Sequence, residues 1–268
     1  MARSIYIASP NAGTGKSTVA LGLVSCLTKV VAKVGVFRPF VESREGDAFL
    51  SLLLNRAGST TPPEQCVGAT WDEFHADPEE ALARIVDAYR AMAREHDVVI
   101  IDGSDFTDVA GNPELALNAR VAANIGVPVL LVVSGQNDVE DVVASVEVSM
   151  AEIADNHART VAVVANKCLP ETRQTVGEAL TAIEGITSTT LPEVPLLAAP
   201  VVREVLDAVE GTLIAGDETL LDREAESVLV CAMDVSHVLE RLTAGQLAIV
   251  PADRSAMLIS LMAAQASS

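Results

Sequence analysis

The sequence is poor in aromatic residues and in basic residues. Only 3% of its 268 residues are aromatic, and 18 Lys and Arg residues stand against 37 Asp and Glu residues, which gives a formal net charge of −19. Contacts to nucleic-acid phosphates or to an anionic membrane surface require clustered Lys and Arg side chains. The composition therefore argues against both nucleic acid and membrane as partners.

Cysteines and long apolar runs are also scarce. The four cysteines (Cys26, Cys66, Cys168 and Cys231) form no CxxC or Cys/His pattern, which favours reduced thiols over a metal site or a disulfide framework. No stretch of 18 or more apolar residues is free of polar interruptions, and the first residues resemble a strand rather than a signal peptide. We therefore expect a cytoplasmic protein without a membrane span.

The sequence is rich in short β-branched runs that alternate with longer helical patterns. This alternation is typical of βαβ units, and it predicts an α/β fold of the P-loop NTPase-like kind, with a mainly parallel sheet and helices on both faces. The predicted strands are 4–8, 34–37, 97–102, 128–133 and 160–165. The predicted helices are 16–31, 46–56, 78–95, 113–124, 138–155 and 171–183.

Prolines mark a change of organisation near residue 200. Pro192, Pro195 and Pro200 disfavour both helix and sheet, so we place a domain boundary there and expect domains at 1–200 and 201–268. Beyond it the sequence predicts strands at 226–233 and 246–251 and helices at 235–242 and 254–265. Two strands do not close a stable sheet unaided. The second, smaller α/β domain is therefore expected to be incomplete.

A phosphate-binding loop is the most informative motif. Residues 9–18 read Ser-Pro-Asn-Ala-Gly-Thr-Gly-Lys-Ser-Thr and follow the first predicted strand. A Gly-rich turn before a helix directs backbone N–H groups and the positive end of the helix dipole at one point, which suits a di- or triphosphate. Pro10 stands where the standard pattern has glycine, so the loop is a variant. The candidate nucleotide- or phosphate-binding residues are Asn11, Gly13, Thr14, Gly15, Lys16, Ser17 and Thr18.

Three predicted strand ends supply further candidates. Asp102 ends an apolar strand and is predicted to hold Mg²⁺ together with Ser17, although a cap of the following turn is the alternative. Pro39 is predicted to stop the second strand and to leave Arg38 at the carboxyl edge of the sheet, where it binds a phosphate or carboxylate or forms an ordinary salt bridge. Asn166 ends the fifth strand and suits either a hydrogen bond to a purine or turn chemistry.

These motifs together resemble a known family. The phosphate loop, Phe37-Arg38-Pro39, the strand ending in Asp102 and the strand ending in Asn166 look like the dethiobiotin synthetase-like P-loop group. More closely, they resemble the N-terminal region of long bacterial phosphate acetyltransferases, in which a DRTGG domain follows the P-loop domain. Residues 248–255 (Ala-Ile-Val-Pro-Ala-Asp-Arg-Ser) are similar to the first half of the DRTGG signature.

The resemblance implies a regulatory or structural role. In that family a separate domain converts acetyl-CoA and phosphate to acetyl phosphate and CoA, and the resemblance described above does not extend to that domain. We therefore expect a region that binds ATP, another nucleotide with Mg²⁺, or a related anionic metabolite, and that is linked to or associated with an acetyltransferase domain in a homo-oligomer. No catalytic residue for acetyl transfer is expected in the chain itself.

Two other functions remain open from the sequence. A stand-alone ATP-dependent synthetase of the dethiobiotin synthetase class is the second candidate, although this chain has Arg38 where those enzymes carry a substrate-handling lysine. The variant Pro10 and the acidic composition leave a third, an interaction module that binds no nucleotide.

Overall fold

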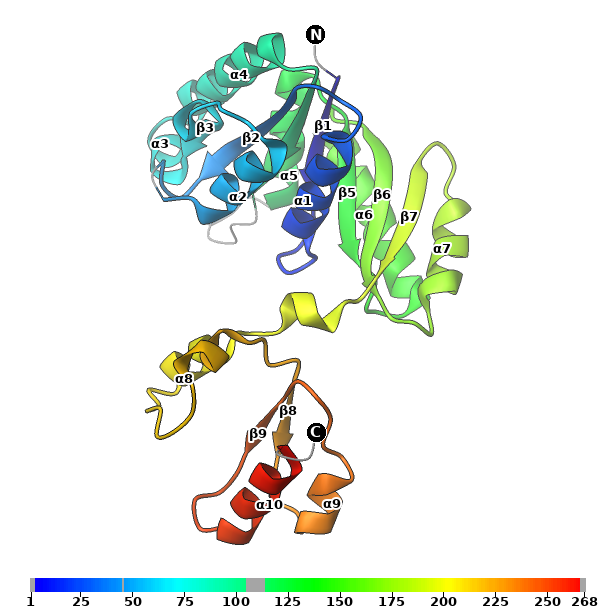
Figure 1. The fold of residues 1–268 in the computed structure, drawn as a ribbon. Coiled ribbons are helices and arrows are strands. Elements are labelled where there is room, and N and C mark those ends of the chain that lie inside the picture. The colour runs from blue at the N-terminus through cyan, green and yellow to red at the C-terminus, as the bar shows by residue number, and fades with distance from the viewer. Residues whose placement is uncertain (1–2, 45, 105–113, 266–268) are drawn as a thin grey trace. The chain divides into compact units, whose positions relative to one another are not determined.

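The chain folds into two compact units, of which unit 1 is Met1–Glu193 and unit 2 is Val194–Ser268. The structure is a computed structural model that describes residues 3–44, 46–104 and 114–265 (Figure 1).

Unit 1 is built around one seven-stranded sheet in the order β3-β2-β4-β1-β5-β6-β7. Every neighbouring pair of strands is parallel. The strands are β1 (Arg3–Ala8), β2 (Val34–Val41), β3 (Val67–Thr70), β4 (Val98–Asp102), β5 (Val129–Ser134), β6 (Thr160–Cys168) and β7 (Thr187–Pro192).

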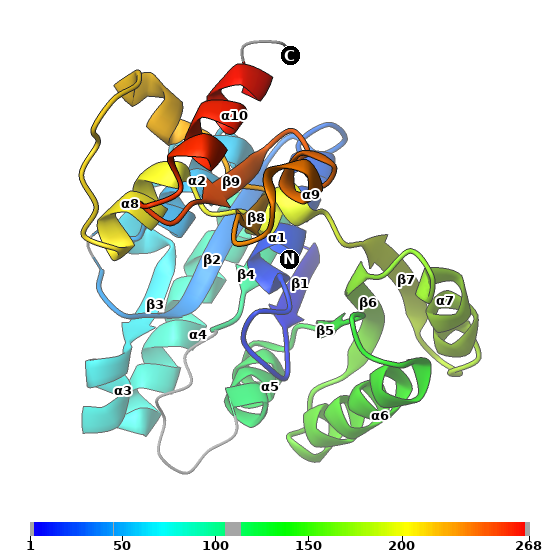
Figure 2. The same cartoon turned by 90° about the horizontal axis from the view of Figure 1, so that it is seen from below.

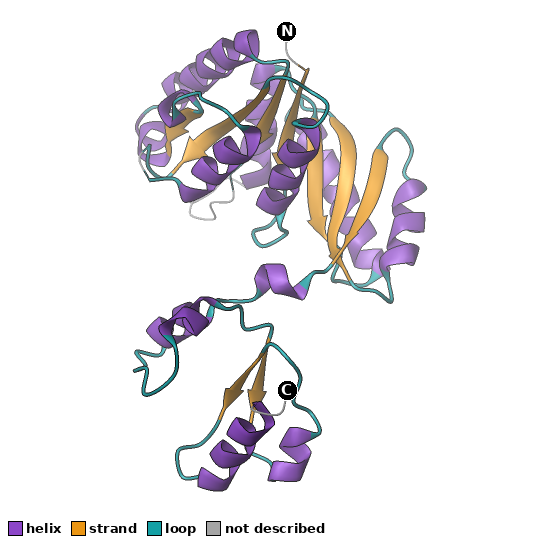
Figure 3. Ribbon diagram, in the orientation of Figure 1, coloured by secondary structure: helices purple, strands orange, loops and turns teal. Residues whose placement is uncertain are grey.

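Helices cover both faces of this sheet. In Figures 2 and 3, α1 and α2 cover one face of the sheet, and α5 and α6 cover the opposite face. Buried parallel strands of this kind read as continuous Val, Ile and Leu runs, because neither face meets water. The helices are α1 (Lys16–Leu27), α2 (Ala48–Ala57), α3 (Trp71–Ala76), α4 (Pro78–Glu95), α5 (Glu114–Ile125), α6 (Val139–Asp155) and α7 (Arg173–Thr181). The predicted P-loop NTPase-like α/β architecture is confirmed.

An aromatic cluster fixes one edge of unit 1. The ring centroids of Phe40 and Trp71 lie 4.8 Å apart in a stacked arrangement, and Phe74 meets Phe40 edge-on at 5.2 Å. All three side chains are buried. Pairs of this geometry contribute about 0.5–1.5 kcal/mol beyond their burial. The cluster therefore anchors the short helix α3 to β2.

Two strands extend beyond their predicted ends. The prediction that Pro39 stops the second strand is wrong, because β2 continues to Val41. The Arg38 N–H donates to the carbonyl oxygen of Cys66, directly before β3, so position 39 faces the β4 side, where pairing has already ended at Phe37. A proline removes no ladder hydrogen bond there. β6 likewise runs past residue 165, and Asn166 pairs with Ser134 inside the strand.

The strands and α-helices of unit 1 that were not predicted are β3, α3 and β7, and a short 3-10 helix at Pro63–Gln65 was also missed. β3 is four residues long and contains Gly68, and β7 is largely Ser and Thr and ends at Pro192. Both lie at the edges of the sheet, where one side of the strand needs no partner. Helix boundaries also differ, since α1 ends at Leu27 and α7 spans Arg173–Thr181. Residue 113, the first of a predicted helix, lies outside the described residues.

Unit 2 is smaller and has a two-stranded parallel sheet. Strands β8 (Ser227–Val230) and β9 (Gln246–Ile249) are shorter than predicted and pair in register. The helices are α8 (Val202–Ala208), α9 (Val235–Leu239) and α10 (Ser255–Gln265). In the described part of the chain, no helix combines the length and apolar character that a membrane crossing requires.

Candidate functional site

The loop between β1 and α1 has the backbone of a phosphate-binding turn. Gly13 and Gly15 adopt φ angles of 76° and 80°, a region that suits glycine far better than other residues. A Cβ atom on Gly15 would lie 2.3 Å from the side-chain nitrogen of Asn166. The loop therefore requires glycine at position 15 both for its conformation and for the close approach of β6.

The first turn of α1 lacks the groups that usually neutralise a helix N-terminus. Gly15 provides no side-chain cap, and no acidic residue lies in the first turn. In contrast, α4 begins with Asp77, whose carboxylate accepts from the N–H groups of Glu79 and Glu80. The partial positive charge at the N-terminus of α1 is consequently not balanced by a carboxylate of that turn, which is the arrangement that favours an anion.

Lys16 and Asp102 form a buried ion pair. Lys16 Nζ lies 2.6 Å from Asp102 Oδ1 and donates to the carbonyl oxygen of Gly103 at 2.5 Å. The two charged side chains are 1% and 0% exposed. Removing either partner of such a pair leaves an uncompensated charge in the protein interior. The predicted phosphate-binding lysine and the predicted metal-binding carboxylate are thus in direct contact.

Arg38 links this pair to a second carboxylate. Its guanidinium forms an ion pair with Asp47, and its side chain lies over the ring of Phe49. Arg38 Nε is also 3.3 Å from Asp102 Oδ2, but the two atoms are not aligned for a hydrogen bond. Among the described residues, Asp102 Oδ2 is therefore a buried oxygen without a hydrogen-bond donor. Arg38 therefore lies inside β2 and forms salt bridges there, and its contact with a phosphate or carboxylate ligand stays a prediction.

The end of β6 holds the phosphate loop in place. The side-chain amide of Asn166 donates to the Thr14 carbonyl at 2.8 Å, and Lys167 Nζ donates to the Gly13 carbonyl at 2.8 Å. Lys167 has a φ angle of 59°. Non-glycine residues adopt such angles mainly where the surrounding contacts maintain them. Asn166 thus positions the loop, and its contact with a purine stays a prediction.

A buried polar network beside Asp102 was missed from the sequence. The Asn118 side-chain oxygen accepts from the Tyr6 hydroxyl at 2.7 Å and from the Ser104 N–H at 3.0 Å. Burial, with the nearby charges of Asp102 and Glu114, raises the pKa of the Tyr6 phenol well above its usual value. Tyr6 therefore stays a neutral donor. The network fixes the backbone directly after Asp102. It was not predicted because Tyr6, Ser104 and Asn118 are far apart in the sequence.

The remaining candidates lie on the loop and on α1. Thr14 is buried, Ser17 is partly exposed, and Asn11 and Thr18 are exposed. Asp47, Gly103, Asn118 and Lys167 join the site without having been predicted. Asp47 was detectable in principle, because it precedes a helix as a capping residue does, and its carboxylate does accept from the Leu50 N–H.

The side-chain oxygens of Asp102 and Ser17 suit Mg²⁺ better than a metal ion that takes most of its ligands from protein side chains. Within the described ranges, no cluster of three or more His, Cys, Asp or Glu side chains is placed to hold a metal ion. Mg²⁺ in nucleotide sites is held by one or two protein oxygens, with phosphate oxygens and waters completing its shell. The Asp102 carboxylate, with one oxygen lacking a hydrogen bond, and the Ser17 hydroxyl match that requirement.

The chain is similar to two protein families and to phosphate acetyltransferases. The AAA domain family matches residues 3–206, and the DRTGG domain family matches residues 204–268. The chain is 25% identical, over all of its length, to phosphate acetyltransferases of Nitratidesulfovibrio vulgaris and Synechocystis sp.. It covers 40% of each of these proteins, so it spans well under half of their length.

Solved structures resemble this chain in fold. Chloroplast FtsY from Physcomitrella patens matches with a TM-score of 0.51 and 19% identity, over 72% of this chain and 59% of that chain. A plasmid partition protein from Borrelia burgdorferi bound to AMPPNP matches with a TM-score of 0.50 and 14% identity, over 82% of this chain and 94% of that chain. At these identities the likeness shows the fold alone.

Proposed function

The chain belongs to the AAA domain family, with a DRTGG domain after it, and on that premise we propose that unit 1 binds a nucleotide at the loop of residues 9–18. We further propose that the chain is the regulatory or structural N-terminal region of a phosphate acetyltransferase. Its curated relatives carry that name, and the chain aligns with two fifths of their length. The acetyl-transfer chemistry then belongs to another domain, covalently linked or associated in an oligomer.

The buried pair of Lys16 and Asp102 carries the nucleotide proposal. Lys16 is the first residue of α1, and its ammonium is held at the end of β4, beside the phosphate loop. A lysine at a helix N-terminus is unfavourable by itself, because the helix dipole places positive charge there. An anionic ligand at the loop resolves that conflict, and Lys16 would exchange Asp102 for a phosphate oxygen.

This exchange makes nucleotide and Mg²⁺ binding interdependent. Once Lys16 turns toward a phosphate, the buried Asp102 carboxylate loses its closest cation and needs another. Asp102 and Ser17 would hold Mg²⁺, which supplies that charge and neutralises the phosphates. Arg38 contributes a second positive charge from β2 and stays paired with Asp47.

Calorimetric titration with ATP and ADP, with Mg²⁺ and with EDTA, tests the proposal. We expect saturable binding that weakens by at least about tenfold without Mg²⁺, and that Lys16→Ala abolishes. Lys29→Ala, which removes an exposed lysine near the end of the same helix, is the matched control and should bind as the parent does. Circular dichroism identifies a variant that fails to fold, in which case Lys16→Arg replaces it.

The absence of any nucleotide binding by the folded parent chain would contradict the proposal and favour the interaction module. The regulatory part is tested separately, in a protein that carries this chain together with an acetyltransferase domain. We expect ATP to change the rate of acetyl phosphate formation, and Lys16→Ala to remove that change. An unchanged rate alongside demonstrated binding would leave only a structural role.

The synthetase alternative gains no support from the geometry. It needs a side chain that handles a carboxylate substrate near the loop, and Arg38 occupies the matching position. Its guanidinium is engaged with Asp47 and lies beside Asp102. Release of phosphate from ATP only in the presence of a carboxylate substrate would reinstate this alternative.

A further inference from the structure

A second candidate site lies at the opposite edge of the sheet from the phosphate loop. A cavity of about 1370 Å³ is formed where β1, β4 and β5 begin and where α4 and α5 end. The phosphate loop follows the carboxyl end of β1, whereas this cavity adjoins Arg3 at its amino end. The two sites are therefore separated by the length of β1 and share no residue.

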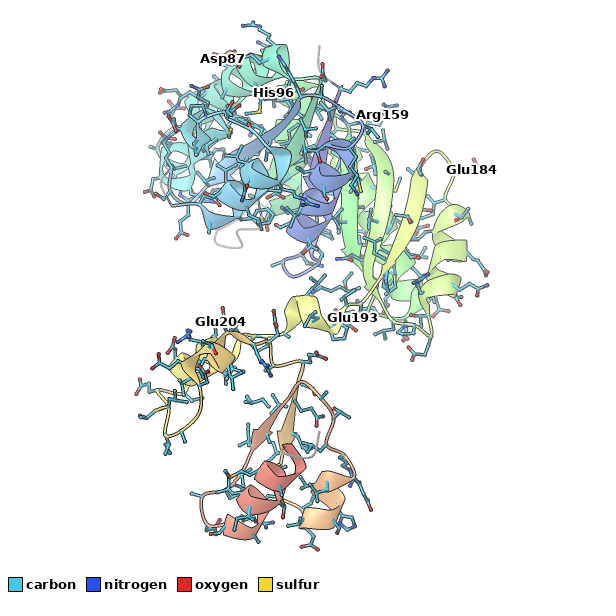
Figure 4. All side chains as sticks on the ribbon, viewed as in Figure 1. Asp87, His96, Arg159, Glu184, Glu193 and Glu204 are labelled. Carbon is cyan, nitrogen blue, oxygen red and sulfur yellow. The ribbon has the colours of Figure 1, made fainter. Side chains whose placement is uncertain are left out.

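Arginines surround this amino-edge cavity, although the chain as a whole is strongly acidic. Arg3, Arg90 and Arg94 line it, and His96 lies among them. Figure 4 shows His96 and Arg159 at the same end of unit 1, and Arg159 lines a smaller hollow that shares Val127 and Pro128 with the cavity. In a chain with 37 acidic and 18 basic residues, three arginines around one cavity are a marked local excess of positive charge.

These arginines are not committed to structural ion pairs. Arg38, Arg44, Arg84 and Arg203 each pair with a carboxylate. Among the described residues, no such pair involves Arg3, Arg90 or Arg94. Asp97 is the carboxylate in the cavity lining, and its side chain accepts from the backbone N–H of Lys33.

Helix stability does not account for the three charges. A cation in the last turn of a helix is stabilised by the negative end of the dipole, which explains Arg94 at the end of α4. That effect falls off within one turn, so it explains Arg90 poorly, and Arg3 is on a strand. Their presence in the lining of one cavity needs another reason.

The floor of the cavity is apolar. Val31, Ala93, Ile125 and Val127 contribute partly or fully buried aliphatic surface. The nearby Tyr89 hydroxyl is already satisfied by Ser4 Oγ at 2.9 Å. Ligand sites commonly combine an apolar lining with a few charged groups that fix orientation, in volumes of about 300–1,000 Å³. This cavity is larger, so it suits a ligand at or above the upper end of that range.

We propose that the amino-edge cavity binds an organic polyanion, a molecule with an apolar framework and two or more carboxylate or phosphate groups. Arg90 and Arg94 lie four residues apart on α4 and can meet one anionic group together, while Arg3 meets another from β1. The apolar framework covers Val31, Ile125 and Val127. The site is independent of nucleotide binding at the phosphate loop.

Chemical-shift titration of the whole chain tests this site with three probes. Pyromellitate carries four carboxylates on a benzene ring, 1-naphthyl phosphate carries a phosphate on an apolar ring system, and inorganic pyrophosphate carries charge alone. We expect saturable shifts centred on the amino-edge residues with one or both aromatic probes, and weaker binding of pyrophosphate at those same residues. The ranking of the two aromatic probes identifies carboxylate or phosphate as the preferred group.

Substitution separates this site from the phosphate loop. The double variant Arg90→Gln/Arg94→Gln should weaken binding of the aromatic probes at least about tenfold. The control Arg173→Gln/Arg223→Gln removes the same charge from exposed positions outside the cavity and should bind as the parent does. The two sites are measured separately, because only shifts of the amino-edge residues report on this cavity, so a failure of the nucleotide proposal does not affect this result.

Several results would overturn the proposal. One is the absence of saturable shifts at these residues when the probes reach concentrations that fill a site with a Kd of about 1 mM. Another is equal weakening in the two double variants, which would indicate a general charge effect. If pyrophosphate bound at the amino-edge residues as tightly as the aromatic probes do, the apolar part of the ligand would contribute nothing to binding, and the proposed ligand class would be wrong.

Discussion

Units 1 and 2 differ in how completely their sheets are covered. In unit 1 seven strands lie between helices on both faces, and even charged groups such as Lys16 and Asp102 are buried. In unit 2 the buried cluster consists of Cys231, Val238 and Met257, with partly buried neighbours around it. Val228, Val230 and Ile249 of its two strands remain exposed.

This difference shows where the chain can maintain precise chemistry. A buried ion pair needs surroundings that exclude water and fix both partners, and in this chain the covered sheet of unit 1 provides them for Lys16 and Asp102. Elements with few buried contacts open locally at a low free-energy cost. We therefore expect unit 2 to open more readily than unit 1, and the candidate sites to lie in unit 1.

The buried cysteines should show the largest contrast between the units. Cys66 and Cys231 are both buried, and burial together with Glu64 raises the pKa of the Cys66 thiol to about 11. With a disulfide reagent at pH 8, we expect Cys231 to react at least about 100-fold faster than Cys66, because unit 2 opens at lower cost and Cys66 forms little thiolate. The exposed Cys26 should react first, and mass spectrometry of the labelled peptides measures each rate.

In denaturant the thiols should react at similar rates, which serves as the control. Equal protection of Cys231 and Cys66 in the folded protein would remove the proposed difference in stability between the units.

Lys16→Ala should have the largest effect on stability. It leaves the buried Asp102 carboxylate without its ammonium partner, which costs about 3–5 kcal/mol in comparable buried pairs. Scanning calorimetry should show a lower transition temperature for unit 1 and an unchanged one for unit 2. Adding Asp102→Asn removes the unpaired charge and should recover part of the loss. An unchanged unit 1 transition would mean that water reaches the pair.

Gly103→Ala should destabilise unit 1 by about 1–3 kcal/mol through steric overlap. A Cβ at position 103 would lie 2.6 Å from the side-chain oxygen of Asn118, 2.7 Å from the Ile7 carbonyl oxygen and 2.8 Å from the Tyr6 ring. Gly22→Ala is the matched control, because a Cβ there meets no atom within 4 Å and the residue lies inside α1. That variant should be more stable than the parent by about 0.5–1 kcal/mol. Urea unfolding measures both, and destabilisation by both variants would refute the steric argument.

The smallest effect is expected from Glu73→Gln at the edge of unit 1. The Thr70 backbone N–H, with Arg44 and Arg84, lowers the pKa of Glu73, so the carboxylate stabilises the folded form above its unfolded pKa. This contribution is lost as the pH falls through the lower, folded pKa. We expect a loss below about 1 kcal/mol above about pH 5, and none in strong acid.

Unfolding free energies of the parent and of Glu73→Gln, measured across that pH range, give the comparison. Asp217→Asn removes a carboxylate of unit 2 that accepts from the Thr219 N–H, and it should leave the unit 1 transition unchanged. A loss in Glu73→Gln that persists unchanged in acid would assign the effect to packing rather than charge.

The sequence predicted the central part of unit 1 because its signals are local. The run before Asp102, the loop before Lys16 and the Asp77-Pro78 start of α4 each carry their own pattern. The end of β4 and the starts of α1 and α4 lie where those patterns place them. The edge strands were missed because a strand exposed on one side can be short and polar. The prediction at Pro39 was wrong because a proline ends a strand only where its missing N–H would have bonded to a neighbouring strand. Which strand position 39 faces is set by the order of strands in the sheet, which the local sequence does not give.

The sequence predicted which residues form the candidate site, but not which of them contact one another. Glycine and lysine spacing identified the loop, and a carboxylate at a strand end identified Asp102. The links from Arg38 to Asp47 and from Tyr6 to Asn118 join different elements, and no local pattern encodes such pairs. The amino-edge cavity was absent from the predictions for the same reason, because Arg3 and Arg90 come to line one cavity only after folding.

The aromatic cluster of Phe40, Trp71 and Phe74 has an optical consequence. Every Phe, Tyr and Trp residue of the chain precedes residue 194, so unit 2 contributes nothing to tryptophan emission or to near-ultraviolet ring absorption. An intrinsic fluorescence melt would thus record unit 1 alone and report an intact protein while unit 2 had already opened. A single tryptophan introduced into unit 2 would make that second event visible.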